Sequence, residues 1–109
     1  MRVLLKILLS ITLALPILLA PAASRETGTS LKNSAMKKFT RKNYAGAVAD
    51  FDKYLKQKPT DKDIILLRGL AKSLMKPEDV AGACADFLAV KSALKDMNVE
   101  TYCANQPGW

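Results

Sequence analysis

Residues 44–51 read YAGAVADF, and residues 80–87 read VAGACADF. Six of these eight positions are identical, and the two stretches begin 36 residues apart. Apolar, helix-forming segments that recur with a period in the thirties are typical of proteins built from stacked helical hairpins. The sequence therefore predicts an all-α fold that contains two such hairpins.

The first 23 residues have the layout of an export signal. Arg2 and Lys6 precede an apolar run at 7–19, and the small residues Ala20 and Ala22 follow that run. This layout predicts a cleaved signal peptide, so we expect a periplasmic or secreted protein. The alternative is a retained membrane anchor. However, the apolar run has 13 residues, which is fewer than the roughly 20 that a spanning helix needs.

Three parts follow the predicted signal. Residues 24–30 are expected to form a flexible lead-in, residues 31–105 the helical repeat domain and residues 106–109 an irregular tail. The formal net charge of +7 falls to +5 when Arg2 and Lys6 are removed with the signal. The chain has no histidine, so it lacks the commonest general base and the commonest zinc ligand.

Hydrophobic periodicity predicts four long helices and a short last one. They are expected at residues 31–41, 44–58, 64–75, 77–90 and 99–103. The third is apolar on nearly every side, so we expect it in the middle of the array with a neighbour on each side. Gly46 and Gly82, inside the second and fourth helices, predict close approach of neighbouring helices at these positions.

Three residues are candidates for helix starts. Asn43 can cap the second helix because its short side chain accepts hydrogen bonds from free backbone N–H groups. Thr60 can cap the third helix, with Asp63 in the capping-box position. Pro77 suits the first turn of the fourth helix, since a proline there lacks only an N–H that would be unpaired anyway.

The two cysteines, Cys84 and Cys103, favour a structural disulfide, because an even count in an exported protein is typical of oxidised pairs. The alternative is two buried reduced thiols that pack as small hydrophobic groups. Both cysteines lie on the apolar side of their predicted helices, so a bond would hold the last helix onto the fourth. Two thiols without histidine make a poor metal site, and we expect no metal and no cofactor.

With both hairpins laid out, residues 31–91 resemble the tetratricopeptide repeat family. The matching positions are Tyr44, Ala47, Phe51, Leu55 and Pro59 in the first repeat, and Gly69, Ala71, Ala83 and Phe87 in the second. The chain departs from the pattern at Tyr54 and Val90, where the family usually has alanine, so the Tyr54 ring must find room or face outward.

The resemblance implies a right-handed array of two stacked antiparallel hairpins that binds a protein or peptide. Two repeats are fewer than such arrays usually need to bury a continuous core. The short C-terminal helix with its disulfide is the expected cap, and a homodimer or a bound partner is the alternative.

The groove of such an array is lined by the first helix of each hairpin. The residues expected on it are Lys32, Met36, Phe39, Leu66, Leu70, Ser73 and Leu74. The three leucines share one helix face and form an apolar stripe that suits a partner helix. The alternative is that this stripe is core, covered by the first or the last helix.

Lys37, Lys38, Arg41 and Lys42 form a basic surface in the sequence, which Lys53, Lys56, Lys58 and Lys62 extend. The simplest interpretation is a solvated face. The functional alternative is a cationic envelope-associated protein that binds anionic lipid or polymer. Apart from the signal, this weak attraction is the only membrane contact we expect, and we expect no binding to nucleic acid.

The acidic residues offer no catalytic site in the sequence. Asp50 and Asp52 are expected on a solvated side of their helix, and the repeat of Asp50 at Asp86 is interpreted as a surface partner for a nearby lysine. The chain also lacks a nucleophile elbow and a phosphate-binding glycine loop, so we expect no enzyme.

Overall fold

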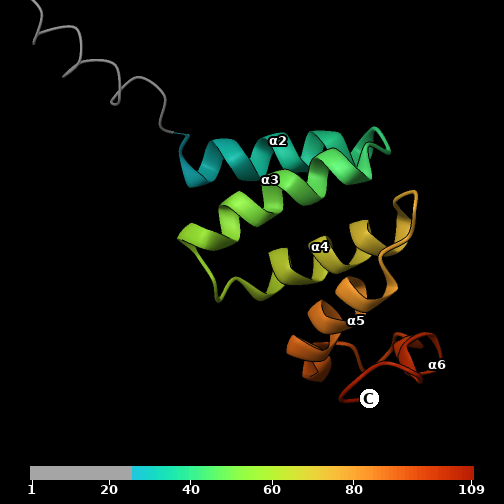
Figure 1. The fold of residues 1–109 in the computed structure, drawn as a ribbon. Helices are drawn as coiled ribbons and strands as arrows, with labels where there is room; N and C mark the ends of the chain where they lie inside the picture. Colours follow the sequence, from blue (N-terminus) through green and yellow to red (C-terminus); the bar gives the residue numbers. More distant parts are fainter. Residues whose placement is uncertain (1–25) are drawn as a thin grey trace, which may run out of the picture.

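The computed structural model describes residues 26–109, and all regular secondary structure in this part of the chain is helical (Figure 1). Its helices are α2 (Gly28–Thr40), α3 (Tyr44–Gln57), α4 (Lys62–Leu74), α5 (Val80–Ala89), the short 3-10 helix η1 (Lys91–Ala93) and α6 (Val99–Cys103). The predicted all-α fold is therefore confirmed. The predicted signal at 1–23, with the first two residues of the lead-in, lies outside the described residues.

Two helical hairpins make up most of the structure. α2 packs on α3, α4 packs on α5, and contacts between α3 and α4 join the two pairs. Both hairpin turns lie at the same end of the molecule (Figure 1). The helix predicted to occupy the middle, α4, does have a neighbour on each side, which explains why its sequence is apolar on nearly every face.

Each long helix starts at a side chain that accepts a hydrogen bond from a backbone N–H three residues later. The caps are Thr27, Asn43, Asp61 and Asp79. The prediction for Asn43 is confirmed, whereas Asp61 caps the third helix in place of Thr60. Similarly, the fourth helix begins at Val80 and not at Pro77, because Asp79 occupies the position that Asn43 has in the first hairpin. The cap at Thr27 also starts α2 at Gly28, inside the predicted lead-in.

The two repeated glycines serve these caps. A Cβ atom at Gly46 would lie 2.6 Å from Nδ2 of Asn43, and one at Gly82 would lie 2.1 Å from Oδ2 of Asp79. The prediction that they mark helix crossings was wrong, because each leaves room for the capping side chain. The glycine at a close helix contact is Gly69, where a Cβ atom would lie 2.9 Å from Cε1 of Phe87.

The hydrophobic core consists of two clusters, the first between α2, α3 and the start of α4, and the second between α5 and the C-terminal segment. The first contains Leu31, Ala35, Ala47, Phe51, Tyr54, Leu55 and Ile64. The second contains Ala83, Cys84, Phe87, Val90, Leu94, Val99 and Cys103. Phe51 and Phe87 are both buried at corresponding places, and Ile65 of α4 packs against both clusters. The repeated octapeptide therefore gives two hairpins with similar interiors.

Tyr54, which departs from the repeat pattern, is buried against the first cluster. Its hydroxyl donates a hydrogen bond to Oδ2 of Asp61 at 2.5 Å. This hydrogen bond raises the pKa of Tyr54 and lowers that of Asp61. The tyrosine thus joins the end of α3 to the start of α4.

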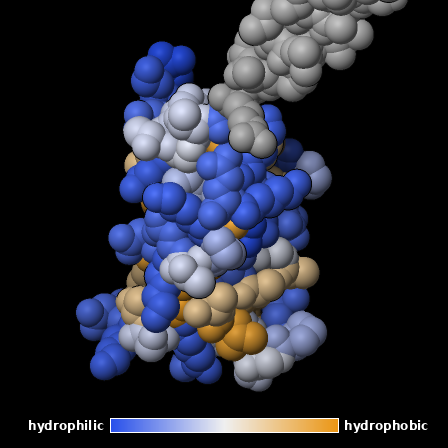
Figure 2. All heavy atoms as spheres, turned by 90° about the vertical axis from the view of Figure 1, so that its left-hand side faces the viewer, coloured by the Kyte–Doolittle hydropathy of each residue, from blue (hydrophilic) through white to orange (hydrophobic). Residues whose placement is uncertain are grey.

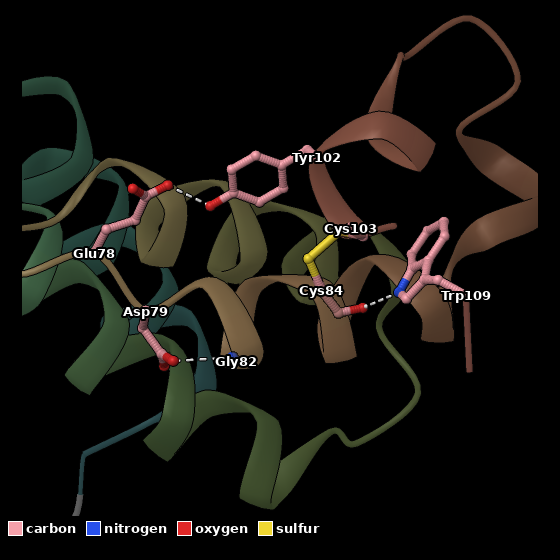
Figure 3. Close-up of a disulfide and its surroundings, with 7 residues drawn as sticks. All are labelled: Glu78, Asp79, Gly82, Cys84, Tyr102, Cys103 and Trp109. Carbon is pink, nitrogen blue, oxygen red and sulfur yellow. Dashed lines mark hydrogen bonds between the residues drawn. A yellow bond between two sulfur atoms is a disulfide. The ribbon is translucent and has the colours of Figure 1, made fainter. Parts of the chain in front are cut away.

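A disulfide between Cys84 and Cys103 links α5 to α6, with the two Cα atoms 5.7 Å apart. This confirms the predicted pair. The tail after α6 is irregular, as expected, yet it is packed. The indole Nε1 of Trp109 donates to the carbonyl oxygen of Cys84 at 3.2 Å (Figure 3), and Lys91 Nζ lies 4.8 Å from the centre of the Trp109 ring. The tail and the disulfide together cover the outer side of α5.

Candidate functional site

The two repeated aspartates are buried, contrary to expectation. Asp50 is 7% exposed and Asp86 is 5% exposed. Asp52, which was grouped with Asp50, keeps about half of its side chain exposed. A buried carboxylate needs hydrogen bonds and opposite charge, so the neighbours of these two groups decide what they do.

In the first hairpin, α2 supplies both partners of Asp50. The hydroxyl of Ser34 donates to Oδ2 of Asp50 at 2.6 Å, and Lys38 Nζ lies 2.9 Å from the same oxygen. Burial acts to raise the pKa of Asp50, but the hydrogen bonds from Ser34 and Lys38 outweigh it and hold the pKa below 3.8. The group is therefore an ionised structural link between α2 and α3.

In the second hairpin, α4 supplies two cations to Asp86. Arg68 binds both carboxylate oxygens, through Nε at 2.9 Å and a terminal nitrogen at 2.7 Å, while Lys72 Nζ lies 3.2 Å away. The other terminal nitrogen of Arg68 donates to Asp52 at 3.0 Å. Arg68 thus connects α5 with α3. The hydrogen bond to Asp86 raises the pKa of Arg68.

These pairs change the interpretation of the basic surface. Lys38 is committed to Asp50, whereas Lys37, Arg41 and Lys42 are exposed. Residues 26–59 contain eight basic and three acidic side chains, which give a formal charge of +5. Residues 60–109 contain six basic and seven acidic side chains, which give a formal charge of −1. The positive charge of the described chain is therefore concentrated in the first hairpin. The side of the molecule that carries the end of α3 is largely hydrophilic, and the largest group of hydrophobic atoms lies low on this face (Figure 2).

The predicted groove residues are divided among three environments. Lys32 is exposed, and Met36 and Phe39 pack against the first core cluster. Leu66 and Leu70 pack against the second cluster, which includes residues of α6. Two leucines of the stripe are therefore partly buried in the core of the second hairpin. The third, Leu74, is 47% exposed.

A mainly apolar hollow lies between α4 and the C-terminal segment, with a volume of about 250 Å³. Its lining residues are Leu70, Ser73, Phe87, Met97, Asn98, Val99 and Tyr102. Leu70 and Ser73 were predicted for the groove. Met97 and Tyr102, which are 40% and 37% exposed, were missed. Their position depends on how residues 97–102 fold back toward α4, and periodicity within the last helix does not reveal this.

Tyr102 fixes one rim of this hollow. Its ring crosses from α6 toward the turn between α4 and α5, where the hydroxyl donates to a carboxylate oxygen of Glu78 (Figure 3). Burial, followed by this hydrogen bond, raises the pKa of Tyr102 to about 12. The hydroxyl therefore stays protonated at neutral pH, and it ties α6 to the second hairpin beside the disulfide.

Residues 26–109 include no cluster of acidic and cysteine side chains that could hold a metal ion. Among the same residues, no helix combines the length and hydropathy needed to cross a bilayer. Comparisons with protein-family models, with curated proteins and with solved structures each find no match. The candidate site is therefore described from its own geometry, as an apolar hollow with exposed hydrophobic side chains at its edge.

Proposed function

We propose that the protein is a small exported scaffold of the tetratricopeptide type, which binds a protein or peptide partner and catalyses no reaction. The observation that carries this proposal is the hollow between α4 and α6. Met97 and Tyr102 lie at its edge, and Leu74 lies one helical turn beyond Leu70. Large hydrophobic side chains gathered at a hollow are typical of surfaces that bind other proteins.

The neighbouring structure supports a rigid binding surface. The disulfide, the Tyr102–Glu78 hydrogen bond and the Trp109 contact fix the C-terminal segment at three places. A site that is ordered before binding loses less conformational entropy when a partner arrives. The hollow therefore suits recognition of a side chain by a preformed surface.

Site-specific photo-crosslinking in the producing organism tests this function. A photoreactive phenylalanine analogue at Leu74 or Met97 should give a covalent adduct with a partner after irradiation. The same group at Ala49, an exposed position on α3, serves as the control and should give none. Equal crosslinking at all three positions, or none at Leu74 and Met97, would contradict binding at the hollow.

Export is proposed from the signal-like layout of residues 1–23 together with the disulfide, which is stable in oxidising compartments. Cell fractionation should find the protein outside the cytoplasm. Sequencing of its N-terminus should start at Ala23 or Ser24, because the small residues Ala20 and Ala22 directly precede the expected cleavage position. An intact Met1 on the fractionated protein would contradict cleavage.

A second candidate function is attraction to an anionic surface through the first hairpin, and the concentration of positive charge in residues 26–59 favours it. Ionic strength separates the two functions. Binding through Lys37 and Arg41 should weaken steeply between low and physiological salt, whereas apolar contacts in the hollow should change little. Lys38 is unsuitable for this test because its loss would also leave Asp50 without its cation.

A further inference from the structure

A second hollow lies next to the apolar one, where the two hairpin turns come together. It has a volume of about 330 Å³, and Lys42, Tyr44, Leu74 and Lys76 are among its lining residues. No carboxylate lines it. Within residues 26–109, neither Lys42 nor Lys76 forms a salt bridge, in contrast to Lys38 and Lys72, which are paired with buried aspartates. The hollow is therefore basic, and its two ammonium groups are available to a ligand.

The two hollows adjoin each other along α4. Leu70 lines the apolar hollow and Leu74 lines the basic one. Because these residues are four apart on one helix, their Cα atoms lie about 6 Å apart along its axis. One short segment of a partner can therefore contact both hollows.

Charge gives this surface a direction. None of the residues that line the apolar hollow is charged. A carboxylate of a ligand would therefore be attracted to Lys42 and Lys76 in the basic hollow, whereas an apolar group would be favoured at the other end. The complementary ligand is thus apolar at the α6 end and acidic at the hairpin turns.

We propose that the partner is a protein segment that places an apolar side chain in the α4–α6 hollow and an Asp or Glu carboxylate between Lys42 and Lys76. This proposal rests on the proposed binding function and specifies the chemistry of the partner. If the segment is helical, one to two turns separate the hollows, so the apolar and acidic residues are about four to seven positions apart.

Selection from a phage-displayed random dodecapeptide library against the purified protein tests the proposal. Enriched peptides should combine a large apolar residue with Asp or Glu at the stated spacing. The test variant is Lys42→Asn with Lys76→Gln. Asparagine is chosen because the backbone at Lys42 has φ 63°, in the left-handed region that asparagine tolerates. The matched control is Lys53→Gln with Lys56→Gln, which removes the same charge from the exposed face of α3.

An enriched peptide, synthesised and titrated at low ionic strength, should bind the Lys42/Lys76 variant about tenfold more weakly, since two exposed ion pairs are lost. It should bind the control variant with unchanged affinity. Enriched peptides without acidic residues, or equal affinity for both variants, would overturn the acidic-partner proposal and leave peptide binding intact. Failure to enrich any sequence would contradict the proposed function itself.

Two other occupants give distinct results. A dimer in sedimentation equilibrium that Leu74→Asp dissociates would show that a second copy of the chain fills the surface, and it would overturn the proposal. Binding to phosphatidylglycerol vesicles that is lost in the Lys42/Lys76 variant but not in the control would also overturn it, in favour of lipid. A monomer without such vesicle binding supports the acidic segment.

Discussion

The two hairpins share one plan and differ in the side chains that complete it. In each, an aspartate and the following phenylalanine are buried at corresponding places, Asp50 with Phe51 and Asp86 with Phe87. In each, the preceding helix supplies the partners of the aspartate from two positions one turn apart. The first hairpin uses Ser34 and Lys38, whereas the second uses Arg68 and Lys72.

The serine-to-arginine difference affects more than one hairpin. A serine hydroxyl reaches only Asp50, but the longer, forked guanidinium of Arg68 binds Asp86 with one edge and Asp52 with its remaining nitrogen. The second hairpin therefore carries a polar link to the first, in addition to the hydrogen bond between Tyr54 and Asp61. We infer that the same buried carboxylate position serves a local purpose in one hairpin and aligns the two hairpins in the other.

The outer helices differ as well. α4 packs on α3, but within residues 26–109 no further hairpin packs on α5, and the disulfide, α6 and Trp109 contact it instead. Two stacked hairpins lack the core that additional repeats would bury. The disulfide supplies part of the stability that this missing core would provide. This comparison leads to four predictions, in order of decreasing effect.

Phe51→Ala and Phe87→Ala test the equivalence of the two interiors. Each removes a buried ring from the centre of one cluster, so each should lower the free energy of unfolding by about 3 to 5 kcal/mol. Urea denaturation of both variants measures the effect. A loss below about 1 kcal/mol at one position would show that the two clusters are not equivalent.

Replacement of both Cys84 and Cys103 by alanine tests the special role of the second hairpin. The bond spans 19 residues of sequence, and its loss should cost about 3 kcal/mol because the unfolded chain is released from a closed loop. Hydrogen exchange should show the greatest loss of protection in α6 and the end of α5. An equal loss throughout α2 would contradict a local capping role.

Asp86→Asn and Asp50→Asn compare the two polar links. Asp86 accepts from Arg68 through both oxygens and also pairs with Lys72, so its replacement should cost about 2 to 3 kcal/mol. Asp50 interacts with one cation and one hydroxyl, so Asp50→Asn should lower the free energy of unfolding by about 1 kcal/mol. Thermal denaturation of the two variants measures the difference. A larger effect at Asp50 would reverse the proposed ranking.

Acid should act on the first hairpin through Asp50. Its pKa in the folded protein lies below the ordinary 3.8, so its stabilisation is complete above the unfolded value and is lost as pH falls through the lower folded value. The stability of the wild type should therefore decrease below about pH 4. Asp50→Asn should show a shallower decrease over the same range. If the stability of the two proteins decreased equally with falling pH, other carboxylates would be responsible for the loss of stability in acid.

The candidate site was only partly predictable from the sequence. Leu70, Ser73 and Leu74 follow from their helix and from the repeat resemblance, and they do lie at or beside the hollow. Met97 and Tyr102 could not be predicted, because their side chains reach the hollow only through the path of the chain after α5. The basic hollow depends on the two hairpin turns lying side by side, which also brings Lys42 and Lys76 together.

The sequence by itself determined the helices, the two hairpins, the central place of α4 and the cysteine pair. These features depend on local periodicity and on a repeat within the chain, and both are visible in the order of residues. The tertiary structure alone decided that Asp50 and Asp86 are buried and that Lys38 forms a salt bridge with the buried carboxylate of Asp50. A charged side chain can be buried only where its partners from another helix arrive, and that meeting depends on the packing of whole helices.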